Sequence, residues 1–179
     1  MSMRKILIAL AVSIVATLAC AVGVLLTAPA FAGDAHASGK SVKHGEFLVN
    51  YGGCHDCHTP GWAEGGGQAS KDMLLTGGGM NFQGPWGTTY APNLRLLVQT
   101  LTAKQWIAKL RSLKSRPAMP YWTFRYLSDK DLTDMYAYIH SLGPAGKPAH
   151  DWVAPGQDAP APYLKLVLPS PPAVVTSGH

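Results

Sequence analysis

Two cysteines and a histidine near the start of the chain lie in a pattern that binds a cofactor. Cys54, Cys57 and His58 form Cys-x-x-Cys-His, the attachment motif of c-type haem. Each thiol can add across one haem vinyl group to form a thioether, and the two-residue gap lets both sulfurs face one porphyrin edge. His58 is then placed to bind the iron from the proximal side. The motif therefore predicts one covalently bound haem c, with iron as its metal.

Three other uses of these cysteines have to be weighed against haem. A thioredoxin-like pair would need a βαβ context, and the sequence pattern does not provide one. A structural zinc site needs four ligands, and no second cysteine pair is present to complete it. A disulfide between Cys54 and Cys57 would strain a short loop. Haem is the favoured interpretation, because thioether attachment takes place outside the cytoplasm and the chain begins with an export signal.

The N-terminal segment carries that export signal. Arg4 and Lys5 precede 21 residues without a charge, 6–26, and small residues stand at Ala30 and Ala32. The pattern predicts a signal peptide over residues 1–32, cut after Ala32. The length of the apolar run also suits an uncleaved anchor in the inner membrane. In both cases we expect the rest of the chain in the periplasm, either free or tethered.

Composition limits the class of protein. The chain has 179 residues, of which 47% are hydrophobic and 14% charged, which excludes a coiled coil and a charged disordered tail. Its 19 glycines and 14 prolines predict much loop. Without Arg4 and Lys5 the formal charge of +5 falls to +3. So small a charge on an exported protein does not predict a nucleic-acid partner.

Three helices are expected to position the motif. Apolar spacing predicts helices over 41–51, 102–113 and 128–142. Thr102 with Gln105 forms a capping box for the second helix, and Ser128 caps the third. No long alternating apolar run predicts a sheet, so the expected fold class is all-α, with short helices joined by long loops.

The helices define the expected organisation of the chain. Residues 33–40 are small and polar and read as a mobile lead-in, followed by a single domain over 41–143. Eight prolines stand from Pro144 onward, so 144–179 is expected to be a proline-rich extended tail. A domain with so few helices would bury a thin core, and a large apolar cofactor would fill it.

The motif and its surroundings resemble class I cytochrome c from about Lys40 to Leu142. The resemblance rests on a first helix containing Gly45, on the Pro92-Asn93-Leu94 segment, and on a last helix containing Tyr138. It implies the class I fold, wrapped around one haem, with Tyr138 packed against Gly45. The longer segment 59–91 is similar to cytochrome subunits that serve bacterial dehydrogenases, which implies a dehydrogenase as electron donor and a cytochrome or terminal oxidase as acceptor.

The resemblance also places the second axial ligand. Class I proteins carry a methionine ligand in a proline-flanked loop before the last helix, where this chain has Met119 between Pro117 and Pro120. The prolines limit backbone freedom and so favour Met119 over Met80, which follows three glycines. Other candidates for this position are Met73, Met135, His44, His140 and His150.

The remaining site residues are expected around the haem. The resemblance implies that the free ring N–H of His58 donates to the carbonyl of Pro92. The two haem propionates need hydrogen-bond donors, and the candidates are Trp86, Tyr90 and Arg95. No acidic residue stands between Met73 and Ser128. That stretch could present a positive rim to an acidic partner or only solvated charges, and its basic residues are Arg95, Lys104, Lys109, Arg111, Lys114, Arg116 and Arg125.

The expected function is transfer of single electrons by a monohaem c-type cytochrome. With His58 and Met119 both bound, the iron would have no open position for a substrate, so the chain is not expected to be an enzyme by itself. One alternative is a haem enzyme or gas sensor with an open distal position. A zinc-binding structural module is a more remote alternative.

Overall fold

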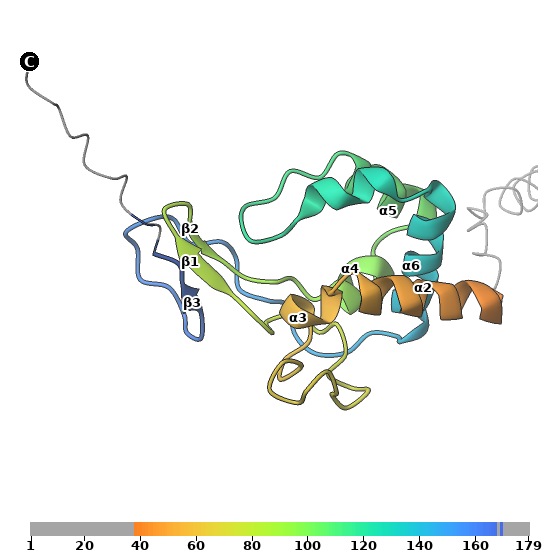
Figure 1. The fold of residues 1–179 in the computed structure, drawn as a ribbon, viewed down its shortest axis with the longest axis horizontal. Coiled ribbons are helices and arrows are strands. Elements are labelled where there is room, and N and C mark those ends of the chain that lie inside the picture. The colour runs from red at the N-terminus through yellow and green to blue at the C-terminus, as the bar shows by residue number, and fades with distance from the viewer. Residues whose placement is uncertain (1–37, 168, 170–179) are drawn as a thin grey trace, which may run out of the picture. The chain divides into compact units, whose positions relative to one another are not determined.

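The computed structural model describes residues 38–167 and 169. The predicted signal peptide, most of the lead-in and the end of the tail therefore lie outside the described residues. Within the described part, the longest helices have 13 residues, and none is long and apolar enough to cross a membrane. The structure is mostly helical and also contains a small sheet (Figure 1).

All three predicted helices are present. Helix α2 spans Gly39–Tyr51, α5 spans Ala103–Arg111 and α6 spans Asp129–Ser141. The Thr102 side chain accepts a hydrogen bond from the amide of Gln105, whose own side chain accepts from the backbone of Thr102, as the capping box predicts. Ser128 caps α6 in the same way with Asp131. These local signals fix where α5 and α6 begin.

Three short helical segments were not predicted. They are α3, Cys54–His58; α4, Leu94–Gln99; and the 3-10 helix η1, Tyr121–Tyr126. None exceeds six residues, so none completes enough turns to give a clear apolar period. Asn93 caps α4 through a hydrogen bond from the amide of Leu96 to its side-chain oxygen, 3.0 Å long.

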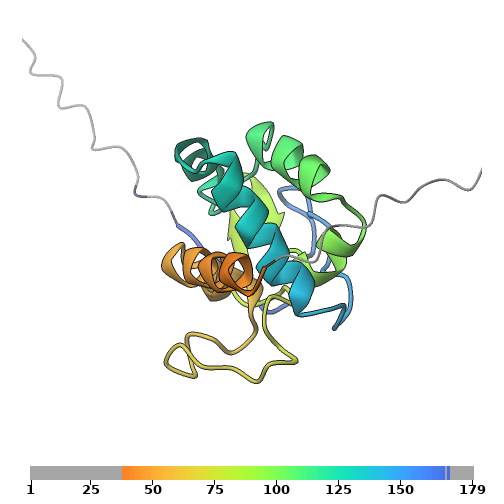
Figure 2. The same ribbon diagram turned by 90° about the vertical axis from the view of Figure 1, so that its right-hand side faces the viewer.

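Helices α2 and α6 pack against each other and cross at Gly45 (Figure 2). A Cβ atom at position 45 would meet the carbonyl group of Asp134 and the amide nitrogen of Met135. The prediction that Gly45 lies at the crossing of the first and last helices is confirmed. The closest atoms are backbone atoms of α6 one turn before Tyr138, which is itself buried.

The small sheet corrects the all-α expectation. Strand β1, Phe82–Gly84, pairs antiparallel with β2, Gly87–Thr89, and parallel with β3, Leu164–Lys165, so the order is β2-β1-β3. Strands of two or three residues are too short to show the alternation that identifies a strand in a sequence. The β3 strand also pairs with a segment about eighty residues earlier in the chain, which no local pattern reports.

Candidate functional site

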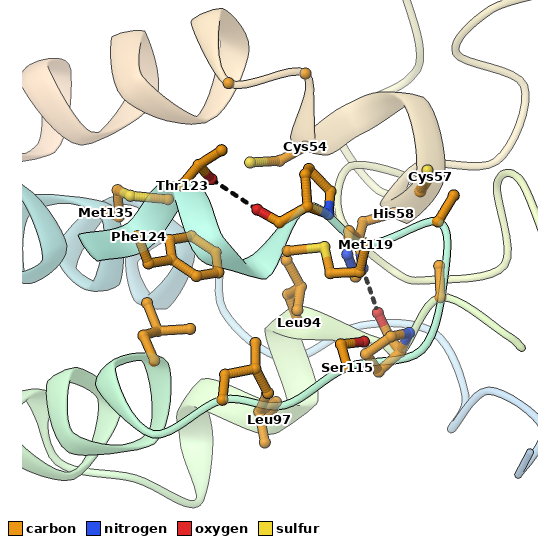
Figure 3. Close-up of a pocket in the computed structure, with 18 of the residues that line it drawn as sticks. Cys54, Cys57, His58, Leu94, Leu97, Ser115, Met119, Thr123, Phe124 and Met135 are labelled. Carbon is orange, nitrogen blue, oxygen red and sulfur yellow. Dashed lines mark hydrogen bonds between the residues drawn. The ribbon is translucent and has the colours of Figure 1, made fainter. Parts of the chain in front are cut away.

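A sharp turn after α2 presents the cysteine motif. Gly53 has φ of 64°, in the left-handed region that glycine adopts readily, and α3 begins at the next residue. In one helical turn, positions i, i+3 and i+4 share a face. Cys54, Cys57 and His58 accordingly all line one cavity (Figure 3). Both cysteines are free thiols, so the disulfide alternative is not what the structure contains.

The other histidine of the motif does not line the cavity. His55 is buried and stacks on Trp62, with ring centroids 4.3 Å apart. Its Nδ1 lies 2.7 Å from the hydroxyl of Thr59, which also accepts a hydrogen bond of 2.8 Å from the amide of Leu75. Burial lowers the pKa of His55 and keeps the ring neutral. His55 therefore anchors the long loop that follows α3.

His58 has the orientation and charge state of a metal ligand. Its Nδ1 donates to the carbonyl oxygen of Pro92 over 2.8 Å, so the predicted hydrogen bond is confirmed. With the proton on Nδ1, the lone pair is on Nε2. Burial lowers the pKa of His58 by more than the Pro92 hydrogen bond raises it, and the ring is neutral. Neutral imidazole is the form that binds a metal.

The cavity that these residues line is apolar and of cofactor size. Its volume is about 480 Å³, within the range of small-molecule and cofactor pockets. Apolar side chains from α2, α4, α5, η1 and α6 form most of its wall, among them Leu48, Leu94, Leu97, Leu110, Phe124 and Ile139. Burial raises the pKa of Cys54 to about 11, so its thiol is protonated at neutral pH. Two free thiols and a neutral imidazole in an apolar pocket fit a covalently attached haem.

Three methionines line this cavity. Met119 comes from the segment between α5 and η1, and Figure 3 shows its side chain beside His58. Met80, the rival candidate, also lines the cavity. Met135 does so from α6 and is buried in the core. Met73 is 42% exposed and is not part of the wall.

The three histidines weighed as ligands lie outside the cavity wall. The Nδ1 of His44 lies 2.8 Å from Asp134 in the interface of α2 and α6. The ring of His140 stacks on Tyr136, and that of His150 meets the ring of Tyr90 edge-on. Each of these rings thus has a partner other than a cavity-bound group.

Of the three expected propionate donors, only Tyr90 lines the cavity. Its hydroxyl donates to the carbonyl of Pro160 over 2.6 Å. Trp86 lies outside the cavity wall, against Gly84 in the β1–β2 turn, and its buried indole N–H has no partner in the described residues.

Arg95, the third expected propionate donor, donates to backbone carbonyls. Its side chain is buried and does not line the cavity. The guanidinium donates to the carbonyls of Leu142 and Gly143, which end α6, and to that of Lys71 over 3.1 Å. Cations at a helix C-terminus satisfy the carbonyls that lack partners in the helix. Arg95 therefore closes α6 and ties a loop to it.

Fewer basic residues lie at the rim of the cavity than the seven that the sequence offers. Arg95 is buried, and Arg111 donates to Asp129 and to the carbonyls of Phe124 and Leu127. The charged residues that do line the cavity are both basic, Lys109 and Arg116. Arg116 lies 3.9 Å above the ring of Trp152, a contact that the sequence did not predict. No local sequence pattern predicts this contact, because Trp152 belongs to the proline-rich tail and lies far from Arg116 in the sequence.

Known proteins similar to this chain point to one kind of protein. The chain is 28% identical over 145 residues to the fructose dehydrogenase cytochrome subunit of Gluconobacter japonicus, a match that covers 75% of this chain and 26% of that protein. It is 31% identical over 130 residues to the gluconate 2-dehydrogenase cytochrome c subunit of Pantoea cypripedii, which covers 66% of this chain and 27% of that protein.

A third relative has the same kind of name. The cytochrome c subunit of the quinone-type alcohol dehydrogenase of Gluconobacter oxydans is 29% identical over 138 residues, 71% of this chain and 27% of that protein. The chain thus spans about a quarter of the length of these relatives. No family model and no solved structure matches it.

Proposed function

We propose that this chain, a relative of the cytochrome c subunits of bacterial dehydrogenases, is a periplasmic class I cytochrome that carries single electrons on one covalently bound haem. The observation that carries the proposal is the common orientation of Cys54, Cys57 and His58 into an apolar cavity whose wall includes Met119. The relatives are named as cytochrome subunits of dehydrogenases. The chain is accordingly an electron-transfer protein and not a catalyst by itself.

Four of the described residues would hold the haem, in different ways. Cys54 and Cys57 would hold it through thioethers, and His58, oriented by Pro92, would bind the iron together with Met119. When bound, the haem supplies reversible one-electron transfer. The apolar wall keeps water away from the site, and the basic residues at its rim disfavour additional positive charge.

The direct test is whether the chain retains haem after it is unfolded. We expect protein matured by a c-type attachment system to keep its haem in denaturant, because two thioethers hold the cofactor. Cys54→Ala or Cys57→Ala should leave a single thioether with a shifted haem absorption spectrum, and the double variant should lose the haem on unfolding. A colourless wild-type protein that contains zinc would contradict the proposal.

We propose that electrons enter from a dehydrogenase and leave to a cytochrome or terminal oxidase across the basic rim of the cavity. Lys109 and Arg116 line the cavity, and the described acidic residues do not. A positive rim attracts acidic partners and raises their rate of encounter, an effect that salt weakens.

Oxidation of the reduced protein by small complexes of known charge tests this rim. Oxidation by anionic ferricyanide should slow as ionic strength rises, whereas oxidation by a cationic cobalt complex should become faster. Lys109→Glu should reduce the ferricyanide rate several-fold at low salt, measured by stopped flow, since it reverses a charge at the rim. Lys71→Glu, which reverses an exposed charge outside the cavity wall, is the matched control. Equal effects of the two variants would contradict a localised rim.

A further inference from the structure

The proline-rich tail lies along the loops that surround the cavity. The side chain of Asn93 donates to the carbonyls of Ala145 and Lys147 over 2.8 and 3.1 Å. The side chain of Asn81 donates to the carbonyl of Pro162 over 3.0 Å, and β3 extends the sheet beside β1. We call residues 144–167 the strap. Its contacts begin beside Pro92, which orients His58, and continue along the hairpin (Figure 1).

One short part of the strap is fixed from two sides. Val153 and Thr88 exchange two backbone hydrogen bonds, of 2.8 and 3.0 Å. The indole N–H of the neighbouring Trp152 donates to the carbonyl of Trp86 over 2.9 Å. Gly87 permits this approach, because a Cβ atom there would collide with the carbonyl of Val153. Trp152 is therefore held firmly against the β1–β2 turn.

The segment that carries Met119 depends on this part of the strap. Residues 115–120, here called the Met119 loop, are mostly exposed and contain no helix or strand. The carbonyls of Met119 and Pro120 accept hydrogen bonds from the adjoining η1. Two polar contacts join the loop to more distant parts of the described chain. The guanidinium of Arg116 lies on the ring of Trp152, and the carbonyl of Pro117 accepts from the hydroxyl of Thr89 over 2.8 Å. Thr89 directly follows Thr88, the residue whose backbone is hydrogen-bonded to that of Val153.

We propose that Trp152 is a positioning residue for Met119: it holds Arg116, and so holds the Met119 loop closed over the cavity. The inference rests on the proposed function in one respect, namely that Met119 binds iron. An exposed loop has several open conformations, and a ligand carried on it reaches its partner only in the closed one. Each contact that favours the closed conformation raises its population, and with it the apparent strength of the methionine–iron bond.

The test compares Trp152→Leu and Arg116→Gln with the wild-type holoprotein. Amide hydrogen exchange in residues 115–121 should become faster by about two- to fivefold in both variants, the loss expected for an exposed cation–π contact. Exchange in α5 and α6 should not change, which separates loop opening from global unfolding. In ferrous protein, carbon monoxide should bind faster in both variants, because it enters when Met119 leaves. The double variant should add nothing further, since either change breaks the same contact.

Two controls make the outcome specific. Trp122→Leu removes an exposed tryptophan from η1, just beyond the loop, and should leave exchange and carbon monoxide binding at wild-type values. Trp152→Phe keeps an aromatic ring under Arg116 but loses the indole N–H and part of the ring, so its exchange and carbon monoxide binding should lie between those of the wild type and Trp152→Leu. The proposal is overturned if Trp152→Leu or Arg116→Gln behaves like Trp122→Leu.

Failure of the proposed function would look different. Wild-type ferrous protein that binds carbon monoxide at once would show that methionine does not bind the iron. The exchange data would still decide whether Trp152 holds the loop, because hydrogen exchange reports the loop itself and not the iron.

Discussion

Met119→Ala should open the iron to carbon monoxide and lower its reduction potential. A thioether is a weak, neutral ligand that favours ferrous over ferric iron, so its loss removes a preference for the reduced state. The Met119 side chain lies beside His58 at the cavity, which makes it our choice for the ligand opposite that histidine (Figure 3). Redox titration measures the potential, and the ferrous absorption spectrum under carbon monoxide measures access to the iron.

Met80→Ala is the matched control, since Met80 lines the same cavity. This variant should keep the wild-type potential and stay inert to carbon monoxide. Ferric protein with an intact methionine–iron bond has a weak near-infrared charge-transfer band, which should vanish in Met119→Ala alone. If it vanishes in Met80→Ala instead, the assignment is wrong. If wild-type ferrous protein already binds carbon monoxide, the alternative of a sensor or enzyme with an open distal position is favoured.

Gly45→Ala should destabilise the protein by about 1–3 kcal/mol, even though alanine is the better helix former. The added methyl group would collide with the carbonyl of Asp134, which belongs to the backbone of α6 and cannot rotate away. Relief requires α2 and α6 to move apart and would disturb the packing of Val49 and Met135. Denaturant unfolding followed by far-UV circular dichroism measures the free energy of unfolding.

Gly39→Ala provides the comparison within the same helix. A Cβ atom at position 39 would have no neighbour within 4 Å, so this change should be neutral or stabilising by up to about 1 kcal/mol. A Gly45→Ala variant as stable as Gly39→Ala would refute close contact between α2 and α6.

The features that were predicted best from the sequence are those that residues close together in the chain determine. Ser128 and Asp131 are three positions apart, and their mutual hydrogen bonds form wherever that turn becomes a helix. Cys54, Cys57 and His58 share a face for the same reason. The hydrogen bond between His58 and Pro92 joins residues 34 positions apart, and it was predicted only through the resemblance to class I cytochrome c.

The sequence did not predict the contacts between segments that are far apart in the chain. Arg95 was expected to bind a haem propionate, and the structure shows that its guanidinium donates to the carbonyls of Leu142 and Gly143, which follow α6. The sequence shows that Arg95 is charged, but it does not show that Arg95 lies close to Gly143 in the fold. The segment after residue 143 was expected to be a proline-rich extended tail, and the structure adds that its backbone pairs with both strands of the hairpin. Proline content predicts an extended conformation but not a pairing partner.

The strap also affects the order in which the protein can fold. Its side-chain hydrogen bonds to Asn93, Tyr90 and Asn81 join residues 52, 70 and 81 positions apart. The α3 turn, by contrast, closes within five residues. Contacts between remote segments form late, because a long loop must close first. The turn that carries Cys54 and Cys57 is therefore expected to form before residues 144–167 dock, and any covalent attachment at the two thiols would not have to wait for the strap.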